Sequence, residues 1–179
     1  MKNKYITKNL FELIQNPIVA AIALHSFTVG YNNNAKLFNK QLLYPKIEYM
    51  FFVLPIVYNQ RALNVFFNSY SISRALEKDH TISLGLQERT IKMIRQTYEG
   101  LNIAFCKNLL YINNSNMTIQ LIYDNGRSIP LPQNVTDCDL IKIQRAAKNL
   151  GSIFAKTNER NIQNNFNIRF RSEERRVGK

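Results

Sequence analysis

The chain has 179 residues, with 24 Lys and Arg against 12 Asp and Glu, and a net charge of +12. This length predicts one domain with a substantial core, because a chain of this mass buries roughly 70% of its unfolded surface. The positive charge favours an acidic partner, with nucleic acid as the first candidate.

Residues 171–179 resemble a foreign tail derived from vector or adaptor sequence. Without its four cations and two anions the net charge is still +10.

Cysteine usage and hydropathy exclude several classes of protein. Cys106 and Cys138 are too few for a disulfide framework, and we expect both to be reduced, buried thiols. No secretory signal pattern follows Met1. The longest apolar run, around residues 49–58, is about ten residues, which is short of the ~20 needed to span a bilayer. The sequence therefore predicts a soluble, cytoplasmic protein with no membrane partner.

The clearest helix lies at residues 16–31 and follows a possible short helix at residues 5–15. Asn16 is a typical N-cap residue, and Pro17 suits the first helical position. Gly30 is placed where a left-handed C-terminal residue would end the helix. A helix that is apolar nearly all round is buried. One of its rows consists of small residues that let another backbone approach closely: Val19, Ala23, Ser26 and Gly30.

The next apolar segment, residues 47–58, predicts a buried helix that is bent or begins at Pro55, because proline argues against a central strand. Residues 59–68 continue as helix. Ser71 or Ser73 is a candidate cap for another helix that ends near residues 76–78.

The second half predicts a helix at residues 86–96 and another from Thr97 to about Lys107, since Gly100 weakens helical continuity. Strands at residues 109–113 and 117–123 are joined by a turn at residues 113–116. Helix, turn, helix and hairpin is the order of a winged-helix unit. One row of the helical segment has core-facing spacing: Ile91, Ile94, Tyr98, Leu101 and Phe105.

The last helix begins at residues 136–139, a start that resembles a capping box. Its predicted inner row is Leu140, Ile143, Ala147, Leu150 and Phe154, and its outer row is Lys142, Arg145, Asn149, Ser152 and Lys156. Residues 157–170 are polar, with Ile162, Phe166 and Ile168 as docking points. The predicted fold is mainly α with a small β-hairpin (α+β): within a single domain, 1–170, a helical part (about 1–80) packs on a winged-helix-like part (81–157).

Catalytic chemistry finds no support in the sequence. His25 and His80 have no second histidine or cysteine at ligand spacing. Asp137 and Asp139 stand at a helix start, where carboxylates serve as caps. No glycine-rich phosphate loop is present. We therefore predict no catalytic residue, metal, cofactor or small-molecule substrate, and no enzyme.

The basic residues are the candidate contact sites for nucleic acid or an acidic partner: Arg89, Lys92, Arg95, Lys142, Arg145, Lys148 and Lys156. They fit a solvated face equally well. The second of the paired helices contributes only Lys107, which is poor material for reading bases. Protein docking or nonspecific DNA contact is therefore favoured over sequence-specific recognition.

Short motifs spread over residues 10–170 carry a family resemblance. They are Asn16-Pro17 with Ala20, Leu24, Phe27, Gly30 and Tyr31; Leu54-Pro55-Ile56 with Arg61 and Leu63; Arg89, Thr97, Leu101 and Leu109-Leu110; Ala146-Ala147, Leu150-Gly151 and Phe154-Ala155-Lys156; and Phe166-Asn167-Ile168-Arg169. With these motifs the chain resembles the middle-component proteins of three-component ABC systems, bacterial conflict systems related to the Lamassu anti-phage type. It departs from the family at Ile153, where an aromatic residue is usual, and at Asn167 and Phe170, where the family tends to have Gly and Pro.

The resemblance implies a small non-catalytic adaptor between an SMC-like or Rad50-like ABC ATPase and an effector protein, which couples DNA or phage sensing to effector release. It assigns roles to no individual residues, since the shared positions are mostly core. Two alternatives stay open: a winged-helix DNA-binding regulator, and a small effector enzyme.

Overall fold

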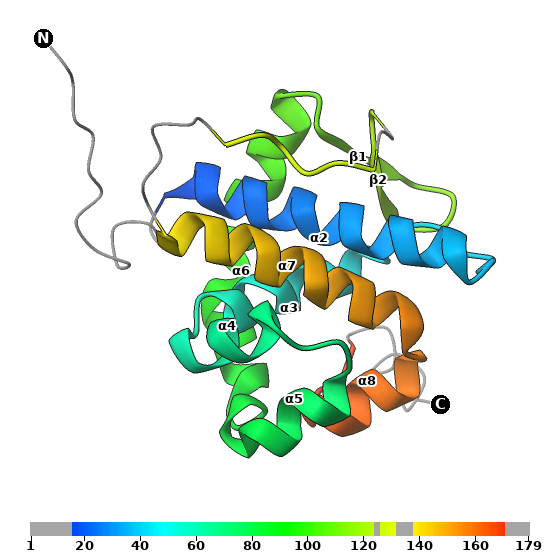
Figure 1. The fold of residues 1–179 in the computed structure, drawn as a ribbon. Helices are drawn as coiled ribbons and strands as arrows, with labels where there is room; N and C mark the ends of the chain where they lie inside the picture. The colour runs from blue at the N-terminus through cyan, green and yellow to red at the C-terminus, as the bar shows by residue number, and fades with distance from the viewer. Residues whose placement is uncertain (1–15, 124–125, 132–137, 171–179) are drawn as a thin grey trace, which may run out of the picture.

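The computed structural model describes residues 16–123, 126–131 and 138–170 (Figure 1). Within these ranges it contains seven α-helices, one 3-10 helix and one two-stranded antiparallel hairpin. The elements are α2 (Pro17–Leu37), α3 (Ile47–Val57), α4 (Gln60–Phe67), α5 (Ile72–Lys78), η1 (His80–Ile82), α6 (Leu86–Cys106), β1 (Leu110–Asn113), β2 (Thr118–Leu121), α7 (Cys138–Lys156) and α8 (Glu159–Phe166). The mainly helical fold with a small hairpin is confirmed. The predictions for residues 5–15, 136–137 and 171–179 lie outside the described residues.

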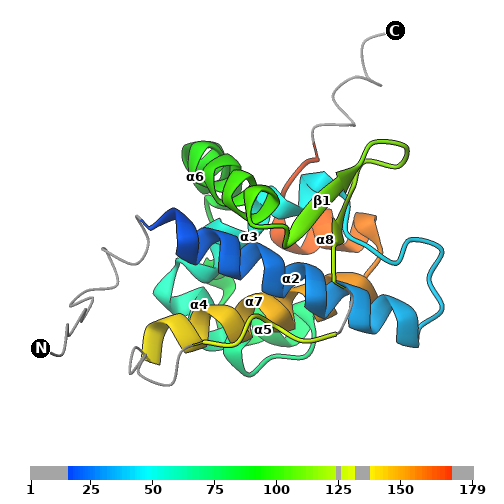
Figure 2. The ribbon, with the colours of Figure 1, turned by 90° about the horizontal axis from the view of Figure 1, so that it is seen from above.

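Helix α2 runs through the middle of the molecule, with α6 on one side and α7 on the other (Figure 2). Asn16 caps it as predicted, because its Oδ1 accepts from the backbone N–H of Ile18 at 2.9 Å. The predicted end at Gly30 is wrong, since the helix continues to Leu37. Burial of α2 on nearly all sides is confirmed, as Leu24, Phe27 and most of its neighbours are inaccessible to solvent.

Gly30 serves close packing and does not terminate the helix. A Cβ atom at Gly30 would lie 1.9 Å from the carbonyl oxygen of Lys148 on α7. Gly151 makes the reciprocal approach, where a Cβ would lie 2.0 Å from the carbonyl oxygen of Phe27. The predicted approach of another backbone along the small-residue row is confirmed at Gly30, and the neighbouring backbone belongs to α7.

Helices α3 and α4 form a sharp corner of 106°. Pro55 lies inside α3, so the alternative that the helix begins at this proline is wrong. Asn59 caps α4, and Ser71, the first of the two predicted candidates, caps α5. No single helix in the described ranges is long and apolar enough to cross a membrane, and only the bent α3–α4 pair reaches that length and composition together.

Helix α6 is one continuous helix, so the predicted break at Thr97 is wrong. The Thr97 hydroxyl donates to the Met93 carbonyl oxygen of the preceding turn at 3.1 Å, which satisfies it inside the helix. Gly100 packs against α2, where a Cβ would lie 2.7 Å from the Cβ of Ala20. Because residues 86–106 contain no turn between two helices, the winged-helix arrangement predicted for them is absent. Cys106, at the end of α6, is exposed, contrary to expectation.

The predicted inner row of α6 is also wrong at two of its five positions. Ile91 and Tyr98 are 61% and 55% exposed. Ile94 and Phe105 are half-buried, and Leu101 alone is buried. The buried face of α6 is rotated from that row toward Leu86, Thr90, Thr97, Gly100, Leu101 and Ala104.

The hairpin forms as predicted, with slightly shorter strands. Leu110 pairs with Leu121, and Asn113 pairs with Thr118. The other edge of β2 meets the start of α3, because the Ile47 N–H donates to the Met117 carbonyl oxygen at 2.9 Å. The hairpin therefore positions α3 as well as covering the core with Leu110 and Leu121.

The predicted inner row of α7 is confirmed, because all five of its side chains are buried. The docking points Ile162, Phe166 and Ile168 are buried as well, and the segment that carries the first two is a helix, α8. Phe170 was not predicted to dock, yet its ring lies 5.1 Å from the ring of Tyr49 and is buried. One hydrophobic cluster thus unites residues from both ends of the described chain.

Candidate functional site

The described residues do not gather a metal-binding cluster. In these ranges no three His, Cys, Asp or Glu residues lie close enough to hold a metal ion. His25 is buried in α2, and burial lowers its pKa to about 4. Its imidazole is therefore neutral at pH 7. His80 is exposed in η1.

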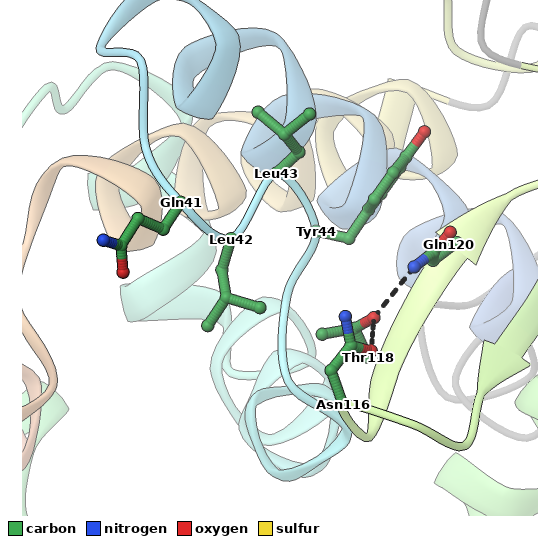
Figure 3. Close-up of a pocket in the computed structure, with 7 residues that line it drawn as sticks. All are labelled: Gln41, Leu42, Leu43, Tyr44, Asn116, Thr118 and Gln120. Carbon is green, nitrogen blue, oxygen red and sulfur yellow. Dashed lines mark hydrogen bonds between the residues drawn. The ribbon is translucent and has the colours of Figure 1, made fainter.

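An open pocket of about 220 Å³ lies between the segment after α2 and the hairpin (Figure 3). Its lining residues are Gln41, Leu42, Leu43, Tyr44, Asn116, Thr118 and Gln120. The Thr118 hydroxyl donates to Asn116 Oδ1 at 2.6 Å and accepts from Gln120 Nε2 at 3.1 Å. These polar groups satisfy one another, and the lining holds no carboxylate, imidazole, amine or thiol. The Tyr44 phenol is the one titratable side chain in the lining.

A partly buried ion pair ties α8 to the start of α3. Lys46 Nζ lies 2.7 Å from Glu159 Oε2, and the Tyr49 hydroxyl donates to the same oxygen at 3.4 Å. Burial and the negative charge of Glu159 raise the pKa of the Tyr49 phenol. Each of these groups already has its partner in the fold, so we assign the cluster a structural role.

The candidate basic residues do not form one cluster. They belong to α6 and α7, two helices that lie on opposite sides of α2 (Figure 2). Lys92 and Arg95 are exposed on α6, where Arg95 Nε lies 2.9 Å from Glu99 Oε1. This pair is largely solvated and contributes little stability.

Arg89 differs from the other candidates because its guanidinium is used inside the fold. Its Nη2 donates to the Ile82 carbonyl oxygen at 2.6 Å and to that of Leu84 at 3.4 Å. Its Nη1 reaches the Pro55 carbonyl oxygen at 3.5 Å. Burial lowers the pKa of Arg89. We therefore leave Arg89 out of the contact surface.

The outer face of α7 carries a row of cations, Lys142, Arg145, Lys148 and Lys156, which we call the cationic ridge. Arg145 and Lys156 are exposed, whereas Lys142 and Lys148 are half-buried. The Lys142 ammonium lies 3.8 Å from Asp139, and the Arg145 guanidinium carbon lies 4.4 Å from the centre of the Phe67 ring. The structure thus brings all four α7 candidates to one face.

Two other members of the predicted outer row of α7 point into the fold. Asn149 Nδ2 donates to the carbonyl oxygens of Phe66 and Phe67 at 3.2 and 2.9 Å. The Ser152 hydroxyl donates to the Gly30 carbonyl oxygen at 3.2 Å. These bonds hold α7 against α4 and α2, and they correct the prediction that both side chains belong to the outer row.

An exposed apolar surface on α6 was missed by the sequence reasoning. It consists of the exposed Ile91 and Tyr98 with the half-buried Ile94 and the half-buried Phe51 of α3, and we call it the α6 patch. The Tyr98 and Phe51 rings meet edge to face, with centroids 5.2 Å apart. Spacing of three and four residues places Ile91, Ile94 and Tyr98 side by side. The signal was present in the sequence, but it was interpreted as a core row.

Comparison with known proteins decides the family. The model for the ABC-three component (ABC-3C) system Middle Component 3 family matches residues 5–170. The chain belongs to this family. No curated protein matched the chain, and no solved structure did.

The match confirms the resemblance inferred from the short motifs. It spans every described helix and both strands, so this Middle Component 3 chain carries the cationic ridge and the α6 patch within its family domain. Its last matched residue is the buried Phe170, and residues 171–179 fall outside the match. The family name implies that the chain works with the other components of an ABC-3C system.

Proposed function

We propose that this chain is a non-catalytic, cytoplasmic adaptor that joins an SMC-like or Rad50-like ABC ATPase to an effector in a Lamassu-like defence system. Membership of the ABC-3C middle-component family supports the pairing with further components. The observation that carries the adaptor role is the α6 patch. It is an apolar surface on a long helix whose buried face packs on α2 and α3.

The α6 patch has the composition of a protein-docking surface. Ile91 and Tyr98 leave more than half of their surface in water. Burying a side chain of this kind is worth about 1.5 to 3 kcal/mol. Tyrosine is also enriched among the residues that dominate interface energetics. We assign the α6 patch to the ATPase, the partner that an adaptor must engage to receive its signal.

The alternative function, a winged-helix DNA-binding regulator, requires a recognition helix that residues 86–106 do not provide. A regulator of that kind places a separate recognition helix in the major groove. Residues 86–106 form one helix that is packed along its length, so no such helix follows a turn there. The third reading, a toxic effector enzyme, predicts that expression of this chain alone stops growth. We expect normal growth.

Co-expression with the ABC ATPase of the same system tests the adaptor role. The affinity-tagged chain is expected to capture the ATPase, and the double variant Ile91→Asp/Tyr98→Asp to reduce capture at least tenfold. The matched control is Ile141→Asp/Tyr70→Asp, which places the same changes at exposed residues outside the patch. Circular dichroism and urea unfolding verify that both variants fold. Equal capture by the two variants would show that the α6 patch is not the docking surface, and no capture by the unaltered chain would remove the ATPase as partner.

A further inference from the structure

We propose that the cationic ridge of α7 binds the sugar–phosphate backbone of duplex nucleic acid without reading its sequence. This goes beyond the adaptor role, and it rests on a different surface. Because the helices that carry the ridge and the α6 patch, α7 and α6, lie on opposite sides of α2 (Figure 2), the two contacts are separable by mutation.

The ridge has the length and charge for several phosphate contacts. From Lys142 to Lys156 it spans 14 residues, which is about 21 Å of helix at 1.5 Å per residue. That length matches roughly six base pairs at 3.4 Å per phosphate along one strand. Asp139 is the one carboxylate in the α7 sequence, and Arg160 continues the positive charge as an exposed residue on α8. Two exposed cations and two half-buried ones on α7 therefore stand against a single anion.

The ridge is held rigidly before any ligand binds. The close contact of Gly30 with the Lys148 backbone fixes α7 on α2. The Phe67 ring lies beneath Arg145, and the amide of Asn149 is bonded to the end of α4. Stacking on an aromatic ring orients a guanidinium and leaves its N–H edge available to a phosphate. The oriented guanidinium of Arg145 therefore loses less entropy on binding than a mobile side chain does.

The composition of the cationic ridge favours nucleic acid over a protein as its ligand. Protein interfaces centre on buried apolar and aromatic anchors. Ile141 is the single large apolar residue that the described part of α7 exposes. The described residues as a whole hold 17 Lys and Arg against seven Asp and Glu, so the surrounding field is positive as well. A uniform positive surface without an apolar centre suits a polyanion.

The same face lacks free groups for reading bases. Asparagine and glutamine amides recognise adenine in the major groove. On α7 the amide of Asn149 serves the carbonyl oxygens of α4, and Gln144 Nε2 donates to the Ile129 carbonyl oxygen at 2.8 Å. Lysine contacts to phosphate position a protein without specifying sequence. The ridge therefore binds duplexes of different sequence with similar affinity.

Fluorescence anisotropy with a labelled 24-base-pair duplex of mixed sequence tests this proposal on the full chain between 50 and 200 mM salt. Four phosphate contacts give a slope of about −3.6 in log affinity against log salt, so affinity falls roughly 150-fold over this range. The triple variant Arg145→Gln/Lys148→Gln/Lys156→Gln is expected to bind at least tenfold more weakly, with a slope nearer −1. The matched control is Arg95→Gln/Lys92→Gln/Lys107→Gln, which removes the same three charges from exposed positions at α6. It is expected to retain affinity within about threefold.

Three outcomes would overturn the proposal. Equal losses in the two triple variants would show that net charge, and not the ridge, attracts DNA. Displacement of the duplex by polyglutamate at equal charge concentration would assign the ridge to an acidic protein. A scrambled duplex that binds at least tenfold more weakly would contradict sequence-independent contact. ATPase capture is measured on the same variants. A loss of DNA binding by the ridge is thereby distinguished from a loss of the adaptor role.

Discussion

Helices α6 and α7 both pack on α2, yet their contacts with it differ in kind. At α7 the approach is backbone to backbone, because the missing Cβ of Gly30 makes room for the Lys148 carbonyl. At α6 the nearest atom to a Cβ on Gly100 is the Cβ of Ala20, a side-chain atom. The outer faces differ too, since α7 presents cations and α6 presents Ile91 and Tyr98. The α7 contact tolerates less change than the α6 contact.

Glycine substitutions give the largest expected effect and test this difference directly. Gly30→Ala is expected to lower the free energy of unfolding by about 3 kcal/mol or more, because a backbone carbonyl cannot move without separating the helices. Gly100→Ala is expected to cost less, about 1 to 2 kcal/mol, since its closest approach of 2.7 Å to the Ala20 Cβ is a milder overlap than the 1.9 Å at Gly30. Urea unfolding measures both values. A gain of stability in Gly30→Ala, as helix propensity alone predicts, would refute the close contact.

Acidification tests how the stability of the fold depends on His25 of α2, the helix on which both α6 and α7 pack. The Nδ1 atom of the buried His25 has no hydrogen-bond partner in the described ranges, and burial lowers its pKa to about 4 from 6.5. At pH 7 the imidazole is neutral in both states. As the pH falls below 6.5, His25 becomes protonated in the unfolded state, whereas in the folded state it stays neutral until about pH 4. Folding stability is therefore lost over that window, by about 2 to 3 kcal/mol at pH 4.5.

Urea unfolding of the unaltered chain and of His25→Gln at pH 7 and pH 4.5 isolates this contribution. The variant lacks the titrating group, so its loss of stability on acidification is expected to be smaller by about 2 to 3 kcal/mol. Identical losses in the two proteins would mean that His25 is protonated within the fold.

The smallest expected effect concerns the outer face of α6. Ile91→Ala is expected to change the free energy of unfolding by less than about 0.5 kcal/mol, as substitutions at exposed positions do. Leu101→Ala, at a buried position of the same predicted row, is expected to cost about 2 to 5 kcal/mol. Urea unfolding of the two variants compares them. Similar costs at both positions would mean that Ile91 belongs to the core.

Arg89 shows how far a residue type predicts a role. An arginine in a basic helix is a reasonable candidate for phosphate contact, and Lys92 one turn along is exposed as expected. Arg89 is turned toward the carbonyl oxygens of Ile82 and of Pro55, and Pro55, 34 residues away, comes near only in the folded chain. No local pattern of charges distinguishes these two residues.

The sequence by itself determined the features that depend on near neighbours. These are the cap at Asn16, the hairpin, the inner row of α7 and the family motifs, whereas the cap of α5 was narrowed only to Ser71 or Ser73. Only the tertiary structure decided that α2 continues past Gly30, that α6 continues past Thr97, and that Ile91 faces water. The physical reason is that spacing along a helix determines which side chains share a face, whereas covering that face requires residues that are distant in the chain. Gly30 suits a helix end and a close helix contact equally well, and the backbone of α7 beside it decides between them.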